Sequence, residues 1–165
     1  MEITNDVTLR GSEWNKAISN LSEIFKTRTN YSLYILAMTI GIMYDRRIEK
    51  PEENGDELKY IPRNVLQNRD NGKLDFLFQA AILSTQTETL TEDQRLELAF
   101  GENVDYNRLG FLTQFANYGV TKLNECIGES SIETMENVKN FLFATVEGRN
   151  LEIDSLPDEV LLMDP

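Results

Sequence analysis

One segment of the sequence is apolar at nearly every position, and it constrains the fold more than any other. It runs from Tyr31 to Tyr44. Its 14 residues are fewer than the roughly 20 residues of a membrane-spanning helix. A helix that is apolar on all faces must be surrounded by other elements. We therefore expect a helix over about 31–47, capped by Thr29 or Asn30, at the centre of a helical bundle.

Periodic apolar residues predict further helices on both sides of this segment. Ser12 can cap a helix in which apolar residues recur at steps of three and four. The charged residues 48–60 predict a loop, and Pro62 suits the first turn of a short helix because its missing N–H would be unpaired there. Residues 74–90 predict a second largely buried helix. The stripe of the first helix consists of Trp14, Ala17, Ile18, Leu21, Ile24 and Phe25.

Capping signals continue the helical pattern in the second half. Thr91 and Gln94 fit a capping box ahead of a short helix. A long helix follows from about Asp105, and Gly128 suits its end because glycine adopts the left-handed conformation found there.

Ser130 or Ser131 opens a last helix, and Gly148 is its expected end. The remaining residues mix apolar and acidic side chains. The predicted fold class is all-α: a compact bundle of about six helices, with two largely buried central helices and an acidic C-terminal tail. We expect a helical domain over residues 1–148 and the tail over residues 149–165.

Composition excludes several kinds of chemistry. The chain has 16 basic and 28 acidic residues, a net charge of −12, no histidine and one cysteine. These counts exclude His-based general bases, Cys/His zinc sites and an intrachain disulfide. The sequence has no glycine-rich phosphate loop, so we expect no cofactor and no enzymatic activity. Residues 1–6 lack the basic start and apolar run of a signal peptide, which predicts a cytoplasmic protein with Cys126 reduced.

Acidic residues near the 48–60 loop raise the alternative of a metal site. Glu57-Leu58-Lys59 matches the acid-x-Lys part of a nuclease core, and Asp45 precedes it. Magnesium sites use one or two carboxylates with waters and substrate phosphate. That core needs its acid and lysine on a mixed sheet, which the sequence does not predict. A solvated charged loop is favoured over a metal-dependent nuclease.

The basic residues around the same loop form the only cationic region of the sequence. Acidic residues such as Glu49 and Asp70 interleave with them, which favours a mixed-charge surface. The alternative is that the basic side chains gather at one end of the bundle and contact nucleic acid or an acidic partner. The candidate contacts are Arg46, Arg47, Lys50, Arg63, Arg69 and Lys73.

The second half of the chain carries almost all of the excess negative charge. Residues 1–82 have a net charge of −1, and residues 83–165 have −11. Acidic helix faces usually keep a protein soluble, and mimicry of a nucleic acid is the alternative. In the tail, consecutive apolar residues beside acids suit either a segment that docks on a partner or one that packs back onto the helical domain. The docking candidates are Leu156, Val160, Leu161, Leu162 and Met163.

Two stretches of the sequence carry a resemblance to a known family. The first is residues 24–28, IFKTR, followed by residues 34–42, YILAMTIGI. The second is residues 115–123, FANYGVTKL. In this order they resemble small accessory proteins encoded with bacterial DNA phosphorothioation (Dnd-type) and related anti-phage defence systems, with Phe115 where the family has tyrosine. The resemblance implies an accessory or regulatory subunit and supplies no catalytic residue.

Small residues within these stretches predict a close contact between two helices. Ala37 and Gly41 on one helix and Ala116 and Gly119 on the other suit a crossing where backbones approach. Asn117, polar beside that apolar stripe, is expected to satisfy backbone groups there, with an orientation toward a partner as the alternative.

The sequence therefore predicts a non-enzymatic accessory or regulatory subunit of a prokaryotic anti-phage defence complex that acts by protein–protein interaction. Its expected partner is a larger protein effector, a nuclease or a translocase, and no membrane partner is expected. A nucleic-acid-binding module and an acidic nucleic-acid mimic or inhibitor are the alternatives.

Overall fold

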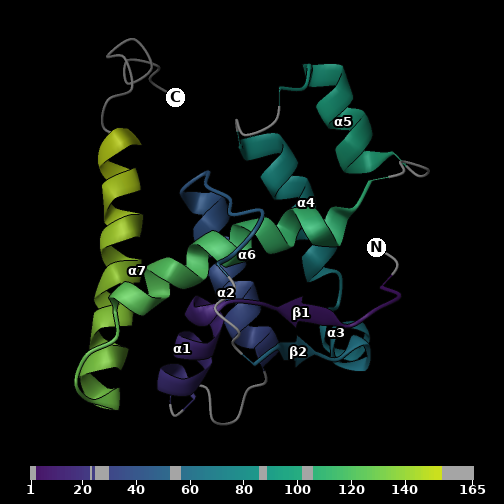
Figure 1. The fold of residues 1–165 in the computed structure, drawn as a ribbon. Coiled ribbons are helices and arrows are strands. Elements are labelled where there is room, and N and C mark those ends of the chain that lie inside the picture. Colours follow the sequence, from purple (N-terminus) through teal and green to yellow (C-terminus); the bar gives the residue numbers. More distant parts are fainter. Residues whose placement is uncertain are drawn as a thin grey trace. The chain divides into compact units, whose positions relative to one another are not determined.

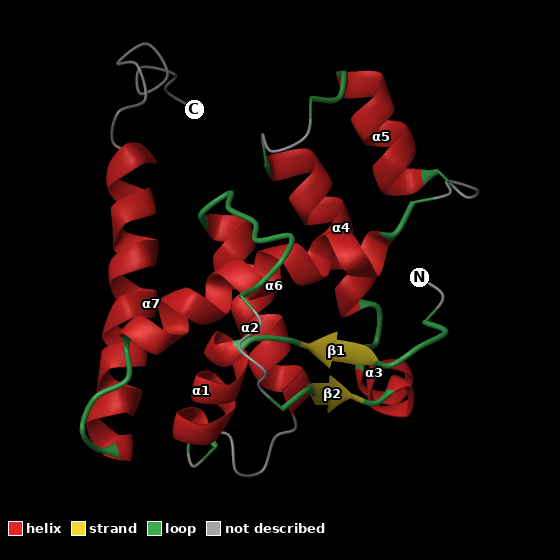
Figure 2. Cartoon of the chain, viewed as in Figure 1, coloured by secondary structure: helices red, strands yellow, loops and turns green. Residues whose placement is uncertain are grey.

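The computed structural model is predominantly helical, which confirms the predicted all-α class (Figure 1, Figure 2). It describes residues 3–22, 24, 30–52, 57–85, 89–101 and 106–153, with side chains as far as residue 144. In this part of the chain the elements are β1 (Val7–Leu9), α1 (Ser12–Leu21), α2 (Asn30–Met43), β2 (Lys59–Ile61), α3 (Arg63–Arg69), α4 (Lys73–Ser84), α5 (Glu92–Phe100), α6 (Arg108–Glu125) and α7 (Ser131–Ile153).

The chain divides into two compact units, Met1–Glu125 and Cys126–Pro165. The first unit holds the elements from β1 to α6, and the second holds α7. Within the second unit α7 continues through Gly148, so the predicted helix end there is wrong. A glycine inside a helix costs only about 1 kcal/mol, which the turns on either side offset. The division into a domain over 1–148 and a tail over 149–165 stays a prediction.

The core of the first unit is the crossing of α2 and α6, near the centre of Figure 1. A Cβ atom at Gly119 of α6 would overlap the carbonyl oxygen of Ala37 on α2, and a Cβ atom at Gly41 of α2 would overlap the carbonyl oxygen of Phe115. The two backbones are therefore in direct contact, which confirms the prediction made from the small residues. Only glycine permits this approach, because any side chain would occupy the place of the opposite backbone.

The second central helix is α6 rather than the predicted 74–90 helix. α6 buries residues along most of its length, from Phe111 to Asn124. In contrast, α4 buries Phe78 on one side and leaves Phe76, on the opposite side, 67% exposed. The sequence of α4 is apolar on nearly all faces, which predicted a largely buried helix. The structure fully buries only the face that carries Leu74, Phe78, Ala81 and Ile82.

Two short strands pair antiparallel, and the sequence did not predict them (Figure 2). Val7 of β1 is opposite Ile61 of β2, and Leu9 is opposite Lys59. Val7, Leu9 and Ile61 are buried, which is the alternation of a strand with one covered face. Each strand has three residues, too few for this alternation to stand out in a sequence. The 48–60 segment therefore ends in a strand rather than remaining a loop throughout.

Two helices begin with the side-chain caps that the sequence predicts, whereas a third helix has a different N-cap residue from the predicted one. Thr91 and Gln94 form the capping box of α5. The Ser130 hydroxyl accepts a hydrogen bond from a first-turn N–H of α7. Ser12, however, is the first residue of α1, and Gly11 holds the N-cap position. The φ of Gly11 is 94°, a value that glycine tolerates and serine rarely adopts, so glycine marks this boundary.

Replacing Gly119 with alanine tests the backbone contact. The added methyl group collides with the Ala37 carbonyl, so the helices must separate, and we expect the free energy of unfolding to fall by about 3 kcal/mol. Urea denaturation followed by circular dichroism measures the change. Gly110→Ala, on the same helix, is the matched control, because the described atoms nearest to its methyl group belong to the Asn107 side chain and not to an opposing backbone. Equal losses in the two variants would contradict a specific crossing.

Two buried tyrosines on α2 anchor this helix to its neighbours. The Tyr31 hydroxyl donates to Asp70 Oδ1 at 3.1 Å, and the Tyr34 hydroxyl is 2.8 Å from Thr113 Oγ1. The same Asp70 oxygen accepts the Leu74 N–H at 2.9 Å and so caps α4. Burial raises the pKa of both tyrosines above the ordinary value of 10.0, and the charge of Asp70 adds to the rise at Tyr31.

Stability should therefore fall at alkaline pH. Above a pH of about 10 the unfolded chain loses its phenolic protons while the fully buried Tyr34 keeps its own in the folded chain, so this tyrosine removes up to about 1.4 kcal/mol of stability per pH unit. Urea denaturation at pH values between about 9 and 11 gives the free energy of unfolding as a function of pH. In Tyr34→Phe this free energy should fall less steeply with pH, by that amount per pH unit. Tyr60→Phe, at an exposed residue, should keep the parent slope. An unchanged slope in Tyr34→Phe would refute this account.

Candidate functional site

The structure does not bring the six predicted nucleic-acid contacts together. The basic residues of the 46–50 segment follow the C-terminal end of α2, whereas Arg69 and Lys73 flank Asp70, which binds Tyr31 in the first turn of α2. With 14 residues α2 is about 20 Å long, so the two groups lie at its opposite ends. This placement does not fit the alternative in which all of the basic side chains gather at one end of the bundle, whereas the favoured interpretation was a mixed-charge surface. The six residues are Arg46, Arg47, Lys50, Arg63, Arg69 and Lys73, of which Arg63 begins α3.

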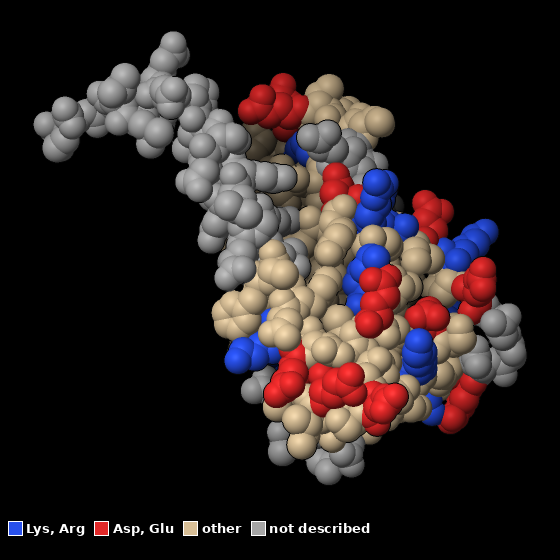
Figure 3. Space-filling view, turned by 90° about the vertical axis from the view of Figure 1, so that its left-hand side faces the viewer, with Lys and Arg blue, Asp and Glu red and all other residues tan. Residues whose placement is uncertain are grey.

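Several of these cations already make contacts within the protein. The Arg47 guanidinium lies over the Phe111 ring, 5.0 Å from its centroid. Arg63 Nη1 donates to a backbone carbonyl, and Lys73 Nζ donates to the Arg69 carbonyl. On the face drawn in Figure 3, basic and acidic side chains are interleaved. These contacts fit a mixed-charge surface, and nucleic-acid binding stays a prediction.

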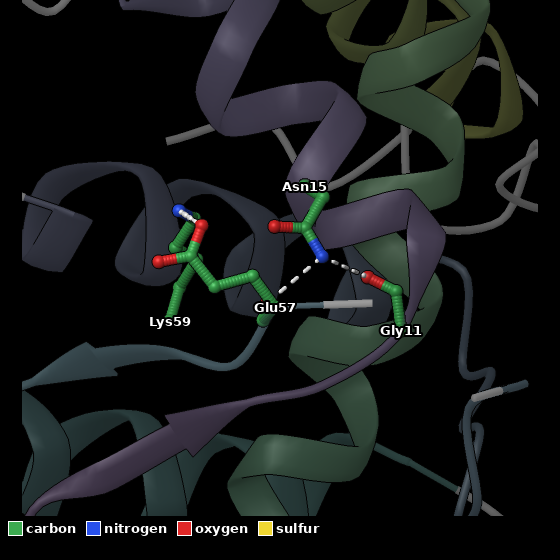
Figure 4. A network of polar contacts seen from close by, with 4 residues as sticks. All are labelled: Gly11, Asn15, Glu57 and Lys59. Atoms are coloured by element: carbon green, nitrogen blue, oxygen red, sulfur yellow. Dashed lines mark hydrogen bonds and ion pairs between the residues drawn. The ribbon is translucent and has the colours of Figure 1, made fainter. Parts of the chain in front are cut away.

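The candidate metal ligand Glu57 forms an ion pair. Its Oε2 is 2.6 Å from Lys59 Nζ, and this hydrogen bond lowers the pKa of the Glu57 carboxyl. The Asn15 amide donates to the Glu57 carbonyl at 3.0 Å and to the Gly11 carbonyl at 3.4 Å (Figure 4). Together these contacts hold the residues before β2 against α1. In the described ranges, no group of three His, Cys, Asp or Glu residues is placed to hold a metal ion.

The predicted docking segment of the tail lies outside the described residues, and its role stays a prediction. This applies to Leu156, Val160, Leu161, Leu162 and Met163.

A cavity of about 550 Å³ opens where α1 begins, between the 48–52 segment and the side of α6. This volume is typical of small-molecule sites. A second cavity of about 380 Å³ shares Arg10, Pro51 and Asn117 with the first. The charged residues that line the larger cavity are Arg10, Glu13, Lys16, Lys50, Glu52 and Glu125.

Asn117 of α6 joins three elements beside this cavity. Its Oδ1 accepts the Trp14 indole N–H at 2.9 Å, and its Nδ2 donates to the Ile48 carbonyl at 3.0 Å. Trp14 belongs to α1, and Ile48 lies in the segment after α2. Asn117 is 7% exposed, and both of its polar atoms are paired. Its role is therefore the structural one that we predicted.

A second buried amide on α6, Asn124, binds the start of α1. Its Nδ2 donates to the Glu13 backbone carbonyl at 2.9 Å and to Glu13 Oε2 at 2.6 Å. The residue is 5% exposed, and its Oδ1 is buried without a hydrogen-bond partner in the described part of the chain. The sequence analysis did not single out Asn124 or Glu13, because 111 positions separate these two residues. Lys50, which also lines the cavity, was named only as a candidate contact for nucleic acid.

α4 and α5 form a hairpin that exposes large apolar side chains. Arg95 of α5 fixes the hairpin, since its Nη1 donates to the Thr85 carbonyl at 2.6 Å and to the Ile82 carbonyl at 3.1 Å. Each helix exposes two apolar residues on one side, spaced seven apart on α4 and four apart on α5. We call Phe76, Leu83, Leu96 and Phe100 the hairpin apolar residues, and the two phenylalanines are 67% and 59% exposed.

No protein-family model, curated protein or solved structure matches the chain. In the part of the chain that the structure describes, no helix combines the length and the apolarity that crossing a membrane requires. The cavity beside Asn117 and the hairpin apolar residues are therefore the basis for assigning a function.

Removing the Asn117 amide should destabilise the protein. Asn117→Ala leaves the Trp14 N–H and the Ile48 carbonyl without this partner, so we expect the free energy of unfolding to fall by about 3 kcal/mol. Urea denaturation followed by Trp14 fluorescence measures it. Asn20→Ala is the control, because that amide is exposed and, among the residues that the structure describes, donates to a carbonyl of its own helix. It should change stability by less than about 0.5 kcal/mol. An equally small change in Asn117→Ala would contradict the structural role.

Proposed function

We propose that the chain is a cytoplasmic, non-enzymatic accessory subunit of a prokaryotic anti-phage defence complex. It acts by binding a larger effector protein, a nuclease or a translocase. The observation that carries this proposal is the exposure of the four hairpin apolar residues.

The hairpin apolar residues gain little from the fold of the chain itself. Burying a leucine or phenylalanine side chain contributes about 1.5–3 kcal/mol. The two phenylalanines leave more than half of their surface in water, and the two leucines, 44% and 45% exposed, leave a smaller part. Phe76 and Leu83 lie opposite the side of α4 that packs on the core, so they are not needed for that packing. Aromatic side chains are enriched at the centres of protein interfaces. A partner that covers the hairpin would recover this free energy.

The charge of the hairpin suggests the chemistry of the partner. Glu92, Asp93 and Glu97 are exposed on α5, whereas the cation of that helix, Arg95, is engaged with the end of α4. Exposed apolar side chains that share a helix hairpin with exposed carboxylates favour a partner with an apolar groove and nearby lysine and arginine. A nuclease or translocase that handles nucleic acid carries such basic surfaces.

The resemblance described above supports the defence context. It includes residues 34–42 and 115–123, and Gly41 and Gly119 of these stretches meet at the helix crossing. The shared residues therefore build the scaffold that presents the hairpin, and the hairpin itself supplies the contact.

Substitution of the two exposed phenylalanines tests the docking surface. The double variant Phe76→Ser/Phe100→Ser should bind the effector encoded beside this chain at least about tenfold more weakly, since two interface side chains are lost. Isothermal titration with the purified effector measures the affinity. Phe143→Ser, at a phenylalanine of α7 that is 57% exposed, is the matched control and should bind as the parent chain does.

Two outcomes would count against this proposal. One is an unchanged affinity in the double variant, and the other is an equal loss in Phe143→Ser. Circular dichroism of the free variants shows whether they fold, which we expect because both phenylalanines lie outside the core.

A further inference from the structure

We propose that α7 pairs antiparallel with the α7 helix of a second copy of the chain, through a stripe of two apolar and two charged residues. We call the following four residues of this helix the α7 stripe: Ile132, Glu136, Lys139 and Phe143. None of them is a hairpin apolar residue, so the pairing uses a different surface from the proposed contact with an effector.

The four residues of the α7 stripe share one side of the helix and are exposed. They follow one another at steps of four, three and four residues, which is the repeat of a helix face. The Lys139 ammonium lies 5.8 Å from the centroid of the Phe143 ring, as this alignment requires. Ile132 is 67% exposed and Phe143 is 57% exposed, whereas on the opposite side Thr134 is buried and Phe141 is half-buried. The α7 stripe is therefore the side of the helix that the described part of the chain leaves uncovered.

The order of the α7 stripe reads the same from both ends. An apolar residue stands first and last, an acid and a base stand between them, and the steps are symmetric. In an antiparallel pair this spacing places Ile132 opposite Phe143 of the second copy. It also places Glu136 opposite Lys139 of the second copy. A two-fold axis makes each contact occur twice, so the pair has apolar contacts at both ends and two ion pairs at its centre.

The charges favour a second copy in this orientation. Neither Glu136 nor Lys139 forms an ion pair with another residue that the structure describes. In a parallel pair each of them would face its own copy, and like charges in contact repel. In the antiparallel pair each faces the opposite charge. The α7 stripe is thus complementary to itself, a property that binding an unrelated protein does not require.

The length of the α7 stripe indicates the strength of the pairing. Covering Ile132 and Phe143 removes apolar surface from water, which supplies the driving force. The α7 stripe spans only about 17 Å of the helix, however. Small interfaces are typical of weak, transient association. We therefore expect a reversible dimer that forms as the protein concentration rises.

Charge reversal tests the pairing. Glu136→Lys brings two lysines together at each central contact, and Lys139→Glu brings two glutamates together there. Each single variant should dimerise at least about tenfold more weakly than the parent chain. The double variant Glu136→Lys/Lys139→Glu restores opposite charges and should regain the parent affinity. Sedimentation equilibrium at micromolar to near-millimolar concentrations measures the dissociation constants.

A mixture and a control make the test specific. An equimolar mixture of the two single variants should form a heterodimer, because the lysines of one chain then face the glutamates of the other. Lys16→Glu, which makes the same charge change at an exposed residue of α1, should keep the parent affinity. Circular dichroism shows that the variants fold, which we expect because the altered residues are exposed.

Three results would overturn the proposal. The first is a parent chain that stays monomeric throughout this concentration range, which would assign the α7 stripe to a different protein. The second is an unchanged affinity in both single variants. The third is a double variant that dimerises no better than the single variants, which would mean that the two charges do not face each other.

Discussion

The direct contact between the backbones of α2 and α6 is the constraint on which the rest of the first unit depends. An almost wholly apolar helix must be covered, and α6 covers it most closely where Gly41 and Gly119 bring no side chain. Two residues before Gly119, Asn117 uses its amide to bind Trp14 of α1 and the segment after α2. One short stretch of α6 therefore sets both the crossing and the position of α1, and the cavity opens between the parts that this stretch holds.

The parts of the fold that depend on local sequence could be predicted. The apolar segment predicted α2, the capping residues predicted the starts of α5 and α7, and the small residues predicted the crossing. Other features depend on distant contacts. The three-residue strands become visible only when Val7 meets Ile61. The exposure of Phe76 depends on which neighbours α4 has, and a sequence that is apolar all round does not reveal that one face stays open.

The candidate site was less accessible to sequence reasoning, for a physical reason. The basic residues appeared as one group because they are close in sequence, but α2 is a rigid rod that places them at its two ends. The cavity instead combines Lys16 of α1 and Lys50 of the segment after α2 with Asn124 of α6. No local pattern relates these residues, since they meet only after α1, α2 and α6 have packed together.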